Sequence, residues 1–264
     1  MTTVIVVLGS GHSGSTLLDL LLGTQPGLWS AGEVVQRPGI YRRPDAEESC
    51  TCGRPIVDCS FWASVRAIAP PEGEAEPPRR RAALEAVAAV SGAEVLVDSS
   101  KQSSYVAGLL DEGVDARVVH LVRDARAVAH SHARKGRDFG PSIRKWVSDQ
   151  AKAQRVLDRF PAAPRTTVRY EDLVRDPAAA LTRILASLLG RAGAVDAWRG
   201  FRARETHLIA GNRMRFSDDA EVRFDDRFLA EVTSSEWWRG TVEARATLRE
   251  FGYPLRRRGY LAHV

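Results

Sequence analysis

A glycine-rich segment near the start of the chain has the spacing of a phosphate-binding loop. It reads Gly9-Ser-Gly-His-Ser-Gly-Ser-Thr16 and lies between an apolar run and a leucine-rich run of helical length. In such loops, backbone N–H groups and the N-terminus of the next helix bind an anion. Ser15 stands where nucleotide triphosphatases have a lysine that contacts the β- and γ-phosphates, so an ordinary NTPase is disfavoured. The residues expected in this anion cradle are Gly11, His12, Ser13, Gly14, Ser15 and Thr16.

A second pair of residues has the chemistry to bind another phosphate. Arg123 follows the apolar residues 117–122, and Ser131 lies two helical turns later on a helix predicted to begin after Asp124, a good N-cap. An arginine and a serine placed in this way can both donate hydrogen bonds to one phosphate. In the alternative interpretation, Arg123 pairs with Asp124 and Ser131 is merely exposed.

The three cysteines have the spacing C-x-C-x6-C, at Cys50, Cys52 and Cys59. A structural zinc site needs four ligands, and this segment supplies only three, so we expect no metal. A stable disulfide is disfavoured in a reducing cytosol. We therefore expect a reduced structural loop anchored by Phe61 and Trp62. The histidines expected to be surface or structural residues are His120, His130, His132 and His207.

The elements that must position these residues alternate between strands and helices. Apolar, β-branched runs predict strands at 3–8, 94–97, 117–122 and 166–169. Helical patterns cover 14–23, 79–90, 124–135, 142–160, 178–189 and 236–251. This alternation predicts an α/β, P-loop-type fold with three layers, in which helices flank a central parallel sheet. Residues that directly follow a strand then lie at the ligand-binding edge.

We expect a single domain over residues 1–264, because no linker separates two apolar regions. Residues 36–78 contain 7 of the 13 prolines and all three cysteines, without sustained apolar periodicity. This composition predicts an irregular insertion at about residues 36–78.

The composition is that of a globular protein, with 44% apolar and 27% charged residues. Disorder, collagen and coiled coil are excluded. Of the 38 basic residues, 34 are arginines, which favours a small anionic ligand over a nucleic acid. No apolar run approaches the roughly 20 residues of a membrane span, and no signal-peptide pattern is present. We expect a cytoplasmic protein without stable membrane insertion, and the sequence is compatible with a homo-oligomer.

In combination, these motifs resemble those of the sulfotransferases that use 3′-phosphoadenosine 5′-phosphosulfate (PAPS). The glycine loop is similar to their 5′-phosphosulfate loop. Residues 121–131 resemble their 3′-phosphate motif, including the eight-residue spacing from Arg123 to Ser131. Tyr170 begins a Tyr-Glu-Asp-Leu segment that resembles the strand end helping to hold the nucleotide. A late loop typical of carbohydrate and bacterial members is matched by Gly211, Asn212 and Arg215.

The resemblance also implies catalytic residues. Gly32-Glu33 resembles a Gly-Glu pair that carries the proposed base in bacterial members related to carbohydrate and tyrosylprotein sulfotransferases, and Lys101 lies in the place of their catalytic lysine. His12 replaces a lysine or arginine found in many members. Beside anionic oxygens we expect His12 to be protonated and to stabilise the leaving phosphate. Alternatively, Glu33 and Lys101 are solvated surface residues.

The function expected from this resemblance is transfer of a sulfuryl group from PAPS to a hydroxyl of a small-molecule, carbohydrate or lipid-linked acceptor. The product would be 3′-phosphoadenosine 5′-phosphate (PAP), and no metal is required. One alternative is a small-molecule kinase with a degenerate phosphate loop, in which Asp98 ends a Walker-B-like strand and binds magnesium. The other is a non-catalytic nucleotide or nucleic-acid binding module.

Overall fold

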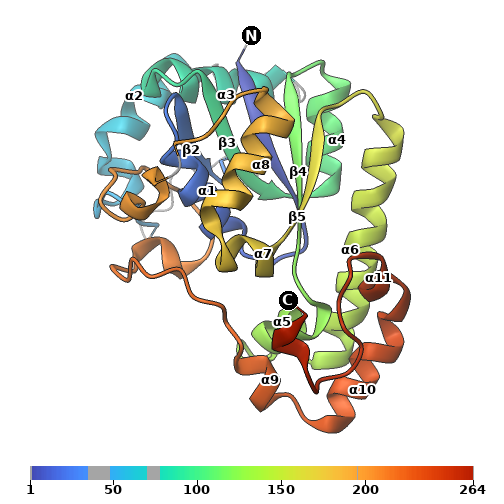
Figure 1. The fold of residues 1–264 in the computed structure, drawn as a ribbon. Helices are drawn as coiled ribbons and strands as arrows, with labels where there is room; N and C mark the ends of the chain where they lie inside the picture. Colours follow the sequence, from blue (N-terminus) through green and yellow to red (C-terminus); the bar gives the residue numbers. More distant parts are fainter. Residues whose placement is uncertain (1, 35–47, 70–77, 195, 264) are drawn as a thin grey trace.

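A five-stranded parallel sheet lies at the centre of the structure, a computed structural model that describes residues 2–34, 48–69, 78–194 and 196–263 (Figure 1). In spatial order the strands are β2 (Leu28–Gly32), β3 (Val95–Lys101), β1 (Thr3–Gly9), β4 (Ala116–Val122) and β5 (Arg165–Arg169). The predicted α/β fold is confirmed. The sequence prediction missed β2, because its five residues mix apolar, polar and small side chains and show no strand periodicity.

Helices cover both faces of the sheet, and β1 shows why both faces must be apolar. Its side chains alternate, so Val4 and Val6 enter one core while Ile5 and Val7 enter the other. The first core is closed by α2 (Ser60–Ile68), α3 (Pro78–Ser91), α4 (Ser103–Asp111) and α6 (Phe139–Arg159). The second is closed by α1 (Ser15–Gly23), α7 (Tyr170–Arg175) and α8 (Pro177–Leu189).

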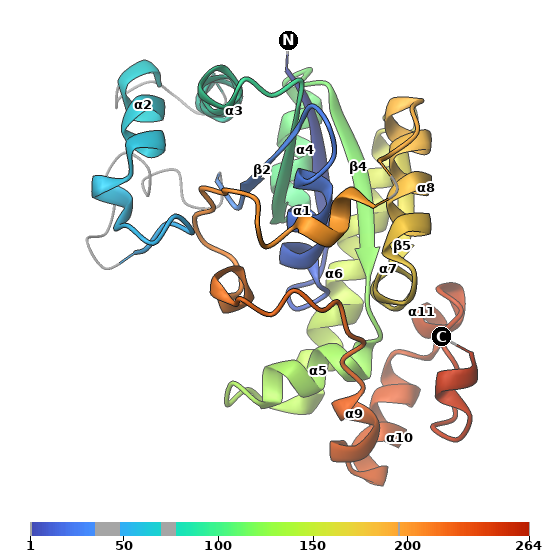
Figure 2. The same ribbon diagram turned by 60° about the vertical axis from the view of Figure 1, so that its left-hand side comes forward.

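The remaining helices form a third core at the carboxyl ends of the strands (Figure 2). They are α5 (Ala125–Ala133), α9 (Arg227–Glu231), α10 (Ser234–Glu243) and α11 (Arg245–Glu250). Short 3₁₀ turns complete the described residues: η1 (Ile56–Asp58), η2 (Ala197–Gly200), η3 (Arg213–Phe216) and η4 (Tyr260–Ala262). None of the described helices combines the length and the apolar composition that crossing a bilayer requires.

The predicted helices are confirmed, with two differences. The helix expected at 236–251 is divided into α10 and α11 at Ala244. The insertion expected to be irregular contains α2, which buries Phe61, Trp62 and Val65 on one face. Of this insertion, residues 36–47 and 70–77 lie outside the described part of the chain.

A buried ion pair holds the elements around the third core together. Asp124 caps α5 by accepting from the Arg126 backbone N–H, and its carboxylate also pairs with the Arg126 guanidinium at 2.6 Å. Both side chains are fully buried. The guanidinium donates to the Pro254 carbonyl at 2.8 Å and lies 3.9 Å from the Trp237 ring centre. This one side chain therefore links α5 to α10 and to the chain end.

Replacing Arg126 with alanine should lower the free energy of unfolding by about 3–5 kcal/mol, because Asp124 would then be a buried carboxylate without its ionic partner. Equilibrium urea unfolding measures this change. Arg155→Ala, at an exposed position on α6, is the control and should stay within about 0.5 kcal/mol of the wild type. Equal stability of the two variants would contradict the linking role of Arg126.

Candidate active site

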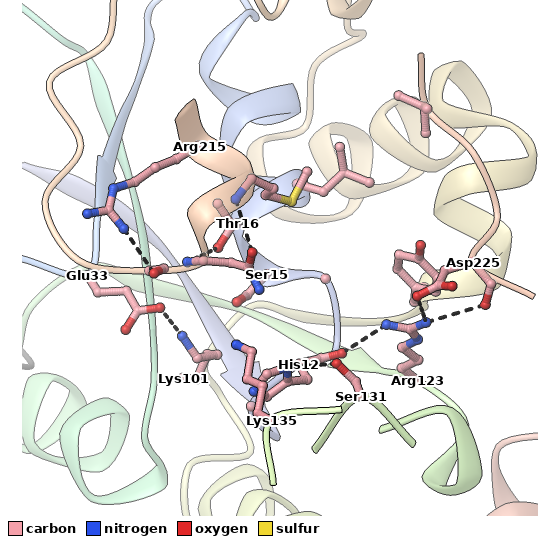
Figure 3. A pocket seen from close by; sticks show the side chains of 18 of the residues that line it. His12, Ser15, Thr16, Glu33, Lys101, Arg123, Ser131, Lys135, Arg215 and Asp225 are labelled. Atoms are coloured by element: carbon pink, nitrogen blue, oxygen red, sulfur yellow. Dashed lines mark hydrogen bonds and ion pairs between the residues drawn. The ribbon is translucent and has the colours of Figure 1, made fainter. Parts of the chain in front are cut away.

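A cavity of about 900 Å³ opens at the carboxyl edge of the sheet (Figure 3). All but one of the predicted site residues line it: Gly11, His12, Gly14, Ser15, Thr16, Glu33, Lys101, Arg123, Ser131, Tyr170, Gly211, Asn212 and Arg215. The exception is Ser13, a loop residue that is buried. A cavity of this size is within the range of known ligand sites. The structure thus brings the predicted residues together, although their individual roles remain predictions.

Gly14 gives the glycine loop its tight turn into α1. Gly14 has φ of +91°, and a Cβ there would lie 2.5 Å from the Tyr170 ring, so only glycine fits. The loop leads directly into α1, whose N-terminus has no side-chain cap. The first backbone N–H groups of the helix are therefore available to an anion. The buried Ser13 hydroxyl also has no hydrogen-bond partner.

Arg123 is held between the glycine loop and a segment late in the chain. One terminal nitrogen donates to the His12 carbonyl at 3.2 Å, and the other donates to the Asp225 carboxylate at 3.2 Å. The guanidinium lies 4.3 Å from the Tyr170 ring centre, and its Nε atom has no partner. The predicted alternative, pairing with Asp124, is wrong because Arg126 occupies that carboxylate.

The Asp225 carboxylate pairs with the Arg123 guanidinium, which the sequence predicts to bind phosphate. Burial raises the pKa of Asp225, but hydrogen bonds from Arg227 and the charge of Arg123 outweigh burial and hold the pKa below its ordinary value. The carboxylate is therefore charged at neutral pH. An incoming phosphate would have to compete with it for Arg123.

The surroundings of His12 favour its neutral form, whereas the sequence predicts a protonated form beside a bound anion. Its Nδ1 lies 2.9 Å from the Ser131 hydroxyl. Burial, followed by the charge of Lys135 and the nearby His132 and Arg137, lowers the pKa of His12 to about 4. The positive charge at the loop therefore comes from the cations around His12.

Several of these cations were missed in the sequence. The additional basic residues lining the cavity are Arg134, Lys135, Arg137, Arg202, Arg223 and Arg227. Arg134, Lys135 and Arg137 come just after Ser131, so their position beside the predicted phosphate motif was a usable signal. Arg202 and Arg223 lie in late loops and Arg227 begins α9, and no local pattern marks any of the three.

Glu33 and Lys101 form an ion pair on the side of the cavity opposite Arg123 (Figure 3). Glu33 follows β2 and Lys101 ends β3, and these two strands are neighbours in the sheet. Lys101 has φ of +67°, a conformation that few non-glycine residues adopt, and it also donates to the Ser99 carbonyl at 3.1 Å. The alternative that both residues are solvated at the surface is wrong, because both side chains are mostly buried.

The loop containing Gly211 closes the cavity above Glu33. Gly211 has φ of +91°, and a Cβ there would lie 3.4 Å from the Thr16 hydroxyl. The Asn212 backbone N–H donates to that same hydroxyl at 3.2 Å, whereas its side chain caps η3 by accepting from the Met214 N–H. Arg215 donates to the Gly211 carbonyl at 2.9 Å. These contacts hold the loop in place.

The expectation that the cysteines lack a fourth metal-ligating partner is wrong. Cys50, Cys52 and Cys59 lie together with His207, and their four potential ligand atoms are within 4.8 Å of one another. His207 is 148 residues beyond Cys59, so spacing within the cysteine segment could not reveal it. The other three predicted structural histidines, His120, His130 and His132, are buried.

Comparison with protein families decides the assignment, because residues 4–190 match the model of the sulfotransferase family. The chain belongs to the sulfotransferase family. No curated protein sequence matches this chain.

Solved structures of sulfotransferases share its fold. The sulfotransferase domain of the Synechococcus PCC 7002 olefin synthase is 21% identical, with a TM-score of 0.60 over 97% of this chain and 96% of that one. The sulfotransferase domain from the curacin biosynthetic pathway is 18% identical, with a TM-score of 0.52 over 94% and 98%. Sulfotransferase STF9 from Mycobacterium avium is 15% identical, with a TM-score of 0.50 over 95% and 77%. At these identities the similarity establishes the fold alone.

In the ligand-free protein, NMR titration of the His12 imidazole should give a midpoint near pH 4 rather than 6.5. In the unfolded chain His12 has its ordinary pKa of 6.5, so it takes up a proton there before it does so in the folded protein. The free energy of unfolding should therefore decrease as the pH falls from about 6.5 toward 4. Lys135→Gln should raise the midpoint by removing a nearby positive charge. Lys152→Gln, on the exposed face of α6, is the control and should leave it unchanged. A wild-type midpoint near 6.5 would contradict this electrostatic account.

Proposed function

We propose that this sulfotransferase-family protein transfers a sulfuryl group from PAPS to a hydroxyl of a small-molecule, carbohydrate or lipid-linked acceptor. The observation that carries the proposal is the convergence of two anion-binding groups and one acid–base pair on a single cavity. The glycine loop and Arg123 are the anion-binding groups, and Glu33 with Lys101 is the acid–base pair.

The two anion-binding groups suit a donor that has phosphates at both ends of its nucleoside. The N–H groups at the start of α1 would bind the 5′-phosphosulfate. Arg123 and Ser131 would bind the 3′-phosphate, with Asp225 released from the guanidinium. Tyr170, packed against Arg123, supports the guanidinium in that position. The cations beside the loop, Lys135 among them, favour a ligand with several negative charges.

The acid–base pair suits in-line sulfuryl transfer. The acceptor oxygen would form a bond to sulfur while the bond between sulfur and the 5′-phosphate oxygen breaks. Glu33 would take the proton that the acceptor hydroxyl loses, and Lys101 would stabilise the transferring sulfuryl oxygens. The charge that develops on the departing phosphate would be stabilised by the α1 N-terminus and Lys135. Once approached by anionic oxygens, His12 would become easier to protonate and add to this stabilisation.

The kinase alternative is disfavoured by the position of Asp98. This carboxylate is fully buried and does not line the cavity. Its two oxygens accept hydrogen bonds from the Tyr105 hydroxyl at 2.7 Å and the Ser100 N–H at 2.8 Å. Burial raises its pKa, against the effect of these hydrogen bonds. A Walker-B aspartate must instead be ionised and must face the nucleotide.

PAP should stabilise the protein against heat, whereas ATP with Mg²⁺ should not. At about 100 times its Kd, PAP would add roughly 2.7 kcal/mol of stability, which corresponds to a Tm increase of roughly 5–10 °C. Arg123→Ala should raise the Kd for PAP at least about tenfold, because it removes a charged hydrogen bond to the 3′-phosphate. The control Arg155→Ala should bind PAP like the wild type. No Tm increase with PAP, or equal binding by Arg123→Ala, would reject the assignment.

Glu33→Gln should lower kcat by on the order of 10²-fold or more, because the amide cannot accept the hydroxyl proton. Its Kd for PAP should stay near the wild-type value. The measurement is PAP release with the best acceptor from a panel of phenols, sugars and fatty alcohols. Glu94→Gln, an exposed residue just before β3, is the control and should retain full activity. A Glu33→Gln variant as fast as wild type at saturating acceptor would show that Glu33 is not the base.

A further inference from the structure

Four side chains with an affinity for soft metals meet at one point outside the active-site cavity. Cys50, Cys52 and Cys59 come from the insertion, and His207 comes from the segment that leads to Gly211. Two features bring them together: hydrogen bonds between Thr51 and Thr206, and a hydrogen bond from the Trp62 indole to the His207 carbonyl at 3.0 Å. Figure 1 shows these two parts of the chain side by side to the left of the sheet.

Four of the six distances between the ligand atoms are close to the edges of a tetrahedron around zinc, and all six are within 4.8 Å. The Cys59 sulfur lies 3.7 Å from each of the other two sulfurs, and the His207 Nδ1 lies 3.3 Å from Cys59 and 3.6 Å from Cys50. With zinc–sulfur bonds of about 2.3 Å and zinc–nitrogen bonds of about 2.0–2.1 Å, a tetrahedral site has sulfur–sulfur edges of about 3.8 Å and sulfur–nitrogen edges of about 3.5 Å. The sulfurs are too far apart for a disulfide.

The backbone of the cysteine segment is folded so that its sulfurs converge. Cys50 N–H donates to the Arg54 carbonyl at 2.9 Å, and Gly53 N–H donates to the Cys50 carbonyl at 3.0 Å. Gly53 has φ of +84°, the left-handed conformation that glycine supplies at a tight turn. Cys59 then lies at the start of α2, as its N-cap residue. Cys50 and Cys59 are fully buried, and Cys52 is partly exposed.

His207 has the surroundings of a metal-ligating histidine. Its Nδ1 faces the sulfurs, while its Nε2 lies 3.2 Å from the Glu205 carboxylate. Metal-bound histidines usually donate their other ring N–H to a carboxylate or carbonyl, which fixes the tautomer and the ring orientation. The ring also stacks on Phe61, with centres 4.7 Å apart and an angle of 1° between the planes.

We propose that Cys50, Cys52, Cys59 and His207 bind one zinc ion. Three sulfurs and one imidazole fill all four positions, so this is a structural site without an open position for substrate. Binding displaces the thiol protons to solvent, and the ion remains Zn²⁺ throughout. The site requires no oxidant or other co-reactant.

The zinc would connect the insertion to one wall of the active-site cavity. Two residues after His207, Ile209 forms a bridge with Gly32, and its carbonyl accepts a hydrogen bond from the Glu33 N–H at 3.4 Å. Gly211 follows directly beside Thr16 and Glu33. The cluster therefore holds the segment that sets the position of Glu33, and metal loss should loosen this wall before it affects the sheet.

The first test is the metal content of the purified full-length chain, measured by inductively coupled plasma mass spectrometry. Wild type should contain one zinc per chain. Cys59→Ser and His207→Ala should each lose the metal, whereas His207→Cys should keep it by completing a four-cysteine site. His263→Ala, at an exposed position, is the matched control and should keep full zinc content.

The second test uses only the wild-type chain, so it stands even if a cysteine variant fails to fold. Protein expressed in zinc-depleted medium with Co²⁺ should show the thiolate-to-cobalt charge-transfer band and the intense d–d bands of a tetrahedral thiolate site. Zn²⁺ should displace these bands at one equivalent. Wild type that contains no stoichiometric zinc and takes up no Co²⁺ would overturn the proposal. Stoichiometric iron in its place, or a disulfide among the three cysteines found by mass spectrometry, would overturn it too.

Discussion

Parallel pairing of the five strands places all of their carboxyl ends on one edge of the sheet, and the core of the candidate active-site cavity depends on this. β1 lies between β3 and β4, so the glycine loop emerges between the strand that ends at Lys101 and the strand that leads to Arg123. Gly9 lies so close to β4 that a Cβ there would be 2.3 Å from the Leu121 carbonyl. The strands can run parallel only because apolar helices cover both faces.

Positive charge around this edge sets the electrostatic properties of the cavity. Burial and nearby cations such as Lys135 both lower the pKa of His12. Several of the site's cations are paired within the protein, among them Arg123 with Asp225 and Lys101 with Glu33. The positive charge would therefore favour binding of a polyanionic ligand, but the ion pair between Arg123 and Asp225 would have to break first. The net affinity reflects the difference between these two effects.

The irregular segments outside the sheet are held by polar contacts as well as by the side chains that they bury in the first core. Such contacts join Thr51 to Thr206, and the Glu48 carboxylate to the Ala210 N–H at 3.1 Å. These contacts connect the insertion to the loop above Glu33. A metal ion at the cysteine–histidine cluster would add a crosslink of the kind that stabilises segments with too little core of their own.

Local patterns along the chain were enough to predict four of the five strands, the glycine loop, and the spacing from Arg123 to Ser131. Local pattern reports these because strand periodicity and loop geometry are properties of consecutive residues. Only the tertiary structure decided which distant groups meet. Asp225 reaches Arg123 from 102 residues away, and His207 reaches Cys59 from 148. Such partners depend on how far-apart segments pack, so no spacing within either segment encodes them.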